Sequence, residues 1–207
     1  MDSNIIMPFE IKEDIDENNI TWLKISGIEP NKSLNIEELE LVKQYERIYL
    51  YCFNSPIDNL PENVKYIKNR WRFNQPINNL PQNLLYLSLH IHFNQSLDFL
   101  PPMLETLEIY ADRFNKPLYN LPNSLKVLTL DSYGYLYPLD NLPNNLETLH
   151  LRLDYYEYAL NNLPKSLKTL ELNSTSCYYY LHKTQFNILY LNTLYPNLNI
   201  IYSTRLA

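Results

Sequence analysis

Apolar residues recur along most of this chain in the order Leu-x-x-Leu-x-Leu, with polar residues between them. Complete copies are Leu84-Leu87-Leu89, Leu104-Leu107-Ile109, Leu125-Leu128-Leu130, Leu146-Leu149-Leu151 and Leu167-Leu170-Leu172. An earlier, imperfect copy has Val64 and Ile67 but carries Asn69 in the last position. Because apolar and polar residues alternate at the end of the motif, each copy predicts a short β-strand with one buried face.

A Leu-Pro pair stands before each of these motifs and sets their spacing. The prolines are Pro61, Pro81, Pro101, Pro122, Pro143 and Pro164, which lie 20, 20, 21, 21 and 21 residues apart. A repeat of this length is typical of a solenoid. A strand of about five residues leaves about fifteen to return to the next coil. Two prolines in most repeats disfavour a helix there, so we expect extended or turn-like backbone opposite the strands.

An aromatic block precedes each Leu-Pro pair. The first copies read Phe53-Asn54-Ser55-Pro56-Ile57 and Phe73-Asn74-Gln75-Pro76-Ile77, and later copies begin at Phe93, Phe114, Tyr135 and Tyr156. We expect Phe73 to stack on Phe53 and Phe93 in a buried spine. The side chain of Asn74 should bond the backbone of a neighbouring coil, because turn amides that are shielded from water need partners. Leu136 and Glu157 replace this Asn in the last two copies, where looser turns are expected.

The combined pattern Phe-Asn-x-Pro-Ile-x-x-Leu-Pro-x-x-Leu-x-x-Leu-x-Leu resembles the FNIP repeat, a relative of the leucine-rich repeat found in amoebae and in the giant viruses that infect them. The resemblance covers about residues 53–172. It implies a curved solenoid that binds other proteins. Many members also carry an amino-terminal F-box that recruits a ubiquitin ligase, and the residues before Phe53 do not resemble that helical box. The ligase role is therefore an open expectation for this chain.

The fold class expected is an α/β-type, mostly β solenoid: a leucine-rich-repeat-like, right-handed coil with a parallel concave sheet and short capping helices. We divide the chain into an N-terminal cap with one or two atypical repeats (1–52), six repeats (53–177) and a C-terminal capping repeat (178–207). Ile20, Leu23 and Ile25 indicate a first strand. A short helix is expected at 35–44 and a strand at 47–52. A capping helix at 182–194 and a last strand at 198–202 should close the other end.

The amino-acid composition limits the kinds of function that can be expected of this chain. The 207 residues carry a formal net charge of -6, which argues against a nucleic-acid partner. Only two cysteines occur and the N-terminus does not resemble a signal peptide, so we expect an intracellular, reducing compartment, in the protein's own or a host cytoplasm. No apolar stretch is long enough for a membrane helix. There are 19 Tyr, but an AT-rich genome favours Tyr and Asn codons, so this number alone does not indicate a function.

Candidate partner-binding residues lie between the buried positions of the strands, on the expected concave face. They are Trp22, Lys24, Arg47, Tyr49, Tyr51, Tyr66, Lys68, Arg70, Tyr86, His90, Glu108 and Tyr110. Trp, Tyr and Arg dominate binding hot spots. The first part of this face is aromatic and basic, so an acidic patch on the partner would complement it. The alternative is that Tyr and Lys are ordinary strand-surface residues in a Tyr-rich protein.

Other functions find weaker support. Thr129, Asp131 and His150 should lie on adjacent coils, but the chain has only two glycines with which to build an anion-binding loop. We therefore expect no enzyme, no metal site and no cofactor. Self-assembly through an exposed terminal strand is the main alternative, with a monomer or weak homo-oligomer expected. RNA binding through stacked Tyr and Lys is a further alternative.

Overall fold

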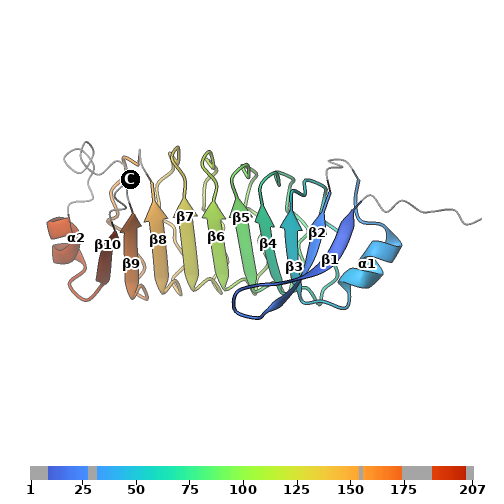
Figure 1. The fold of residues 1–207 in the computed structure, drawn as a ribbon. Coiled ribbons are helices and arrows are strands. Elements are labelled where there is room, and N and C mark those ends of the chain that lie inside the picture. Colours follow the sequence, from blue (N-terminus) through green and yellow to red (C-terminus); the bar gives the residue numbers. More distant parts are fainter. Residues whose placement is uncertain (1–8, 28–31, 154–155, 174–187, 204–207) are drawn as a thin grey trace, which may run out of the picture.

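The structure is a row of coils that stack their strands into one sheet. The computed structural model describes residues 9–27, 32–153, 156–173 and 188–203. Within them, ten strands pair in chain order, and Figure 1 shows them side by side with a short helix at either end. The strands are β1 (Glu10–Ile15), β2 (Thr21–Ser26), β3 (Arg47–Tyr51), β4 (Tyr66–Arg70), β5 (Tyr86–His90), β6 (Thr106–Tyr110), β7 (Val127–Asp131), β8 (Thr148–Arg152), β9 (Thr169–Asn173) and β10 (Asn199–Ser203). The helices are α1 (Ile36–Val42) and α2 (Ile188–Leu194).

From β2 to β10 the strands are parallel and their repeats are in register. Leu87 of β5 pairs with Leu107 of β6, which pairs with Leu128 of β7. All three side chains are fully buried, as are most of the corresponding apolar residues along the sheet. Ile77 and Leu80 close the core from the opposite side of their coil, as expected. The prediction of a mostly β, leucine-rich-repeat-like solenoid is therefore confirmed.

The N-terminal end differs from the prediction. β1 pairs antiparallel with β2, so the sheet is not parallel throughout. The first predicted strand is present as β2, but Ile20 lies outside it and is exposed. The sequence did not reveal β1 because four of its six residues, Glu-Ile-Lys-Glu-Asp-Ile, are charged and hide any buried face. A charged edge strand discourages pairing with another chain.

Both predicted helices are present, and α1 is shorter than predicted. Asn35 caps α1, and its side chain accepts a hydrogen bond from the backbone N–H of Glu38 at 2.9 Å. The Glu38 carboxylate in turn accepts one from the N–H of Asn35 at 2.7 Å, which completes a capping box. Of the predicted helix 182–194, the described residues contain α2. Cys177, expected in the spine, lies outside the described residues.

An aromatic spine runs through the core behind the sheet. Ring centroids of Phe73 and Phe93 lie 6.2 Å apart with the planes 2° from parallel. Phe93 stacks in the same way on Phe114, and Phe114 on Tyr135, both at 6.2 Å. Tyr135 continues the spine to Tyr156 at 6.3 Å. The predicted stacking of Phe73 on Phe93 is thus confirmed, but Phe53 does not stack on Phe73: its ring packs at 45° against Phe9, with the centroids 5.2 Å apart. The spine extends across five coils from Phe73 to Tyr156.

An asparagine ladder beside the spine joins successive coils. Asn54 Oδ1 accepts a hydrogen bond from the backbone N–H of Asn74 at 2.8 Å, and Asn74 Oδ1 accepts one from Asn94 at 2.8 Å. Asn94 and Asn115 continue the ladder to the N–H groups of Asn115 and Leu136, both at 3.0 Å. The ladder stops at Leu136, whose exposed side chain has no amide. The predicted role of this Asn is confirmed.

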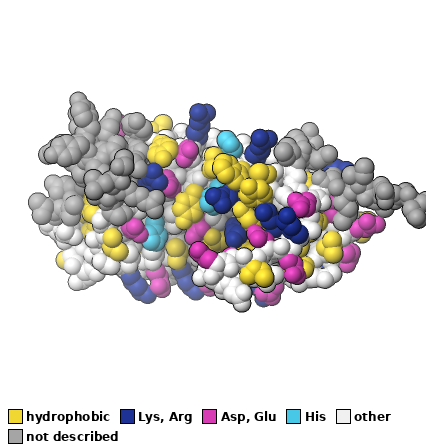
Figure 2. Space-filling model, viewed as in Figure 1, with side chains coloured by type: hydrophobic (Ala, Val, Ile, Leu, Met, Phe, Trp, Pro, Cys, Tyr) yellow, Lys and Arg dark blue, Asp and Glu magenta, His cyan; other side chains and the backbone are white. Residues whose placement is uncertain are grey.

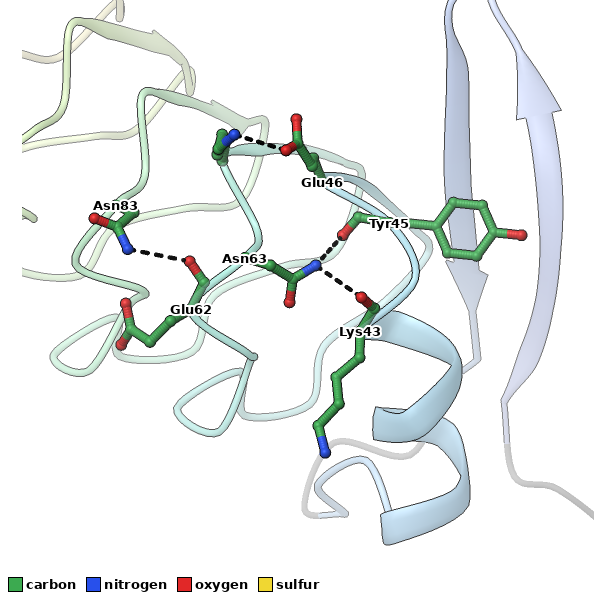
Figure 3. Close-up of polar contacts among 7 residues, drawn as sticks. Lys43, Tyr45, Glu46, Glu62, Asn63 and Asn83 are labelled. Atoms are coloured by element: carbon green, nitrogen blue, oxygen red, sulfur yellow. Dashed lines mark hydrogen bonds and ion pairs between the residues drawn. The ribbon is translucent and has the colours of Figure 1, made fainter.

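A second set of side chains ties the coils together just before the strands. Asn63 Nδ2 donates to the backbone carbonyls of Lys43 and Tyr45, both at 3.0 Å, as Figure 3 shows. Asn83, Ser124, Asn145 and Ser166 occupy the same position in later repeats, and each donates to a carbonyl of the preceding coil. These bonds fix the coil spacing at the edge where every strand begins.

The connection from strand to spine has two lengths. Two residues separate β4 from Phe73 and β5 from Phe93, whereas three separate β6 from Phe114. This one residue accounts for the change in repeat length from 20 to 21. In the short connections Trp71 and Ile91 have positive φ angles of 78° and 31°. Left-handed backbone costs an L-residue roughly 1–2 kcal/mol, so the short coils store strain at these turns.

Replacing Ile91 with Asn is expected to raise the free energy of unfolding by about 1 kcal/mol. Ile is branched at Cβ and tolerates a positive φ poorly, whereas Asn adopts this conformation readily. Urea unfolding followed by circular dichroism measures the change. Ile91→Val is the matched control, since it keeps the branched Cβ and should bring no gain. If Ile91→Asn lost at least as much stability as Ile91→Val, the result would contradict the proposal that the backbone at Ile91 is strained.

Candidate partner-binding face

Alternate residues of each strand point away from the core and form the sheet face. In its central row, Lys24 lies beside Tyr49, Tyr49 beside Lys68, and Lys68 beside Ser88. Ser88 then lies beside Glu108 of β6. Figure 2 shows this face, with basic and hydrophobic side chains gathered over part of it. The sheet face is the surface that the sequence analysis assigned to a partner.

Cations and aromatic rings interleave on the first part of this face. Lys68 Nζ lies 4.1 Å from the centroid of the Trp22 ring and 4.8 Å from that of Tyr49. Lys24 Nζ lies 4.2 Å from the Tyr51 centroid. These distances are within the range in which a cation is attracted to a ring. We call the group Trp22, Lys24, Arg47, Tyr49, Tyr51, Tyr66, Lys68 and Arg70 the cation–aromatic cluster; within it Arg47 lies 3.8 Å from the Tyr66 centroid.

The charges of the two halves of the face are balanced differently. In the second half, Arg152 pairs with Asp131 at 3.2 Å, and His150 Nδ1 lies 2.7 Å from Glu171 Oε2. Among the described residues, no carboxylate lies within 4.0 Å of the charged nitrogens of the four cations in the cluster. The second half therefore neutralises its own charges, and the cluster leaves its positive charges to aromatic rings.

Burial and the positive charge of the cluster shift the pKa values of side chains on the sheet face. Desolvation lowers the pKa of Lys68, although the carboxylates of Asp16 and Asp14 act in the opposite direction. The pKa of His90 falls to about 4, first because the ring is buried and then because Arg70 and Lys68 repel its protonated form. His90 is therefore neutral at physiological pH and presents an uncharged ring to any partner.

Between the cluster and the second half of the face, four predicted site residues form two contacting pairs. The Tyr86 hydroxyl donates to Glu108 Oε2 at 2.5 Å. Burial, followed by this hydrogen bond, raises the pKa of Tyr86. The rings of His90 and Tyr110 lie 4.9 Å apart. Glu108 is thus held by a neighbouring strand and marks the acidic limit of the cluster.

Trp22 is less available than the sequence suggested. Only 8% of its surface is exposed, and its indole Nε1 donates to Asp16 Oδ2 at 2.8 Å. This hydrogen bond is the main reason that the pKa of Asp16 is lowered. Trp22 therefore serves as a platform for Lys68 rather than as a free anchor for a partner.

Two features of the face were missed at the sequence level. β1 places Glu10, Lys12 and Asp14 in register with Ser26, Lys24 and Trp22, so the first edge of the face is mainly acidic. No signal in the sequence could have placed them, because β1 itself was not predicted. Trp71 was also missed, although 42% of its surface is exposed and Arg70 lies 5.8 Å from its ring. The sequence did offer one signal for Trp71, namely a Trp directly after a predicted strand.

The residues weighed for catalysis and for metal binding can be placed in the structure. His150 contacts Glu171, not Asp131 as the catalytic alternative would require. No group of three or more His, Cys, Asp or Glu side chains within the described ranges could hold a metal ion. Across the same ranges no helix is long and apolar enough to cross a bilayer.

In-register coils, an aromatic spine and a sheet built from one strand per coil define a leucine-rich-repeat-like solenoid. The family model described as FNIP Repeat matches residues 53–92 and 93–133, so this part of the chain is built from FNIP repeats. The matched residues contain β4 to β7 and three rings of the spine, Phe73, Phe93 and Phe114. No curated protein matches the chain.

Proposed function

We propose that this protein is an interaction module that holds a partner protein on the sheet face across β2 to β6. The observation that carries the proposal is the cation–aromatic cluster, where four cations contact rings and have no carboxylate partner in the described residues. Such a surface combines the residue types that dominate binding hot spots with charge that a partner can neutralise. Membership of the FNIP repeats, a family implicated in protein interaction, supports the same function.

The side chains of the cluster are also already ordered, which lowers the entropic cost of binding a partner. Its side chains stand on strands that pair on both sides, and Lys68 and Arg47 are already held against rings. Ordering a flexible side chain costs about 0.5–1.5 kcal/mol on binding, and this cost is reduced where the side chain is held beforehand. The proposal therefore favours a rigid recognition surface.

The double variant Tyr66→Ala/Arg70→Glu is expected to recover at least fivefold less of the specific partner than the wild type. It removes the ring under Arg47 and reverses a cation of the cluster. Affinity capture from host-cell lysate, followed by quantitative mass spectrometry, measures the recovery. Tyr158→Ala/Lys168→Glu is the matched control, because it also removes one Tyr ring and reverses one cation, at exposed positions distant from the cluster. Equal recovery by both double variants would contradict the proposal.

An adaptor or substrate-recognition role beside a ubiquitin ligase is the form of this function that the family resemblance favours. The same capture experiment tests it. Ligase subunits enriched by the wild type and lost with Tyr66→Ala/Arg70→Glu would support the adaptor role, and their absence from the specific partners would contradict it.

Self-association is a second candidate because of β10. In the described sheet this last strand pairs only with β9, contains no charged residue and exposes Ile201. Uncharged edge strands are ready to pair with another chain. Light scattering over a range of concentrations tests this candidate, since a constant monomer mass would exclude it.

A further inference from the structure

The residue directly after a strand is buried in some coils of the solenoid and exposed in others. After β6 and β7 it is Ala111 or Ser132, and both are fully buried. After β4 it is Trp71, which has a φ of 78° and is 42% exposed. The left-handed turn thus displays a large apolar ring where later coils bury a small side chain. Strained backbone of this kind tends to mark functional positions.

Trp71 continues the cation–aromatic cluster over the edge at which the strands end. Arg70 joins the two, because it stands on the sheet face and lies 5.8 Å from the Trp71 ring. Arg72 follows Trp71 and is also exposed. Among the described residues, neither arginine has a carboxylate within 4.0 Å. One continuous surface therefore combines four cations that have no carboxylate within 4.0 Å in the described part of the chain, Lys24, Arg47, Lys68 and Arg70, with an exposed apolar ring.

Acidic groups border this surface on both sides. Glu10 and Asp14 of β1 lie at its first edge, where Glu10 pairs with Lys12 at 2.9 Å, and Glu108 of β6 stands at the other edge. The four strands between them, β2 to β5, span about 15 Å at the usual strand spacing. About five extended residues cover that length. A longer polyanion such as a nucleic acid would meet carboxylates at either end, whereas a short acidic run fits between them.

We propose that the cation–aromatic cluster and Trp71 together bind a short acidic segment of a partner protein, with Trp71 packing against an apolar residue of that segment. The inference rests on the proposed function and names the chemistry of the partner. The carboxylates of the segment meet Lys24, Arg47, Lys68 and Arg70, none of which has a carboxylate within 4.0 Å among the described residues. Its apolar residue covers the exposed face of Trp71 and removes that ring from water.

Fluorescence anisotropy with defined probes tests the inference on the full chain. The first probe is a labelled peptide in which two Asp and two Glu surround one Phe, flanked by Gly and Ser. The second replaces the acids with Asn and Gln, and the third is an oligouridylate of equal length. At about 0.1 M salt the acidic peptide should bind at least tenfold more tightly than either of the others. Equal binding of the amide peptide, or tighter binding of the oligouridylate, would overturn the inference.

Trp71→Gly separates binding from folding. Glycine adopts a φ of 78° without strain, so this variant should melt no lower than the wild type. Its affinity for the acidic peptide should nevertheless fall at least fivefold. Phe99→Ser removes another exposed aromatic ring, 64% exposed and outside the cluster, and should leave the affinity unchanged. Unchanged affinity in Trp71→Gly, or an equal loss in Phe99→Ser, would overturn the role of Trp71.

The two tryptophans provide a second readout. Trp71 is exposed and Trp22 is buried, so iodide should quench mainly Trp71. The acidic peptide should reduce this quenching, and no reduction at saturating peptide would contradict contact with Trp71. If Tyr66→Ala/Arg70→Glu loses a lysate partner but no acidic peptide binds the wild type, the proposed function stands and this inference fails.

Discussion

Replacing Phe93 with Ala is expected to lower the free energy of unfolding by about 3–5 kcal/mol, the usual cost of removing a buried Phe. Phe93 is fully buried and stacks on both Phe73 and Phe114 at 6.2 Å. Its removal opens a cavity that touches three coils at once. Neighbouring coils are also tied by the asparagine ladder, so they cannot close together to fill the space.

Urea unfolding followed by circular dichroism measures this change. Phe99→Ala is the matched control, because Phe99 lies in the same coil but is 64% exposed; its cost should stay below about 0.5 kcal/mol. A stack of coils can also unfold in parts. Hydrogen exchange at Leu89 and Ile109, on β5 and β6, should then show that opening begins beside the cavity. A cost below about 1 kcal/mol for Phe93→Ala would mean that the spine is not a main source of stability.

Removing one hydroxyl in Tyr156→Phe is expected to cost about 2 kcal/mol. The Tyr156 oxygen accepts a hydrogen bond from the backbone N–H of Leu139 at 3.0 Å, and both residues are buried. Phe keeps the ring in the spine but leaves this N–H without an acceptor. An unpaired donor that is shielded from water costs more than a lost surface hydrogen bond.

Tyr158→Phe makes the same chemical change two residues away, on a side chain that is 46% exposed. Its effect on urea unfolding should stay within about 0.5 kcal/mol. Equal costs for the two variants would show that water reaches the Leu139 N–H. This hydroxyl also gives Tyr156 a role beyond stacking: the asparagine ladder ends at Leu136, and the Tyr156 side chain bonds the backbone of that coil instead.

The regular part of the fold could be predicted because each of its contacts repeats in the sequence. Leu87 and Leu107 occupy equivalent positions, so one buried residue predicts the next, and the same holds for Phe73 and Phe93. The asparagine ladder followed from the need to pair backbone groups in turns. These predictions needed only the local pattern and the repeat length.

The irregular features depend on contacts that a local pattern does not contain. β1 is stabilised by pairing with β2, and its own residues alternate too weakly to indicate a strand. The Trp22 indole is held by Asp16, which the β1–β2 turn brings to its nitrogen. The sequence placed Lys68 on the correct face, but its position over Trp22 depends on the register of β2 to β4. Trp71 was missed because exposure there depends on a left-handed turn.

The asparagine ladder also makes each coil exchangeable. Deletion of residues 94–114 would join Phe93 directly to Asn115, so a Phe-Asn pair would again follow β5, and Asn74 Oδ1 would meet the N–H of Asn115 in place of that of Asn94. Duplication of the same stretch would preserve the same bonds. Recombination can therefore lengthen or shorten the recognition surface in steps of about 4.8 Å, one strand at a time, without redesigning a core. For such a protein, length is itself a heritable trait on which selection by a changing partner can act.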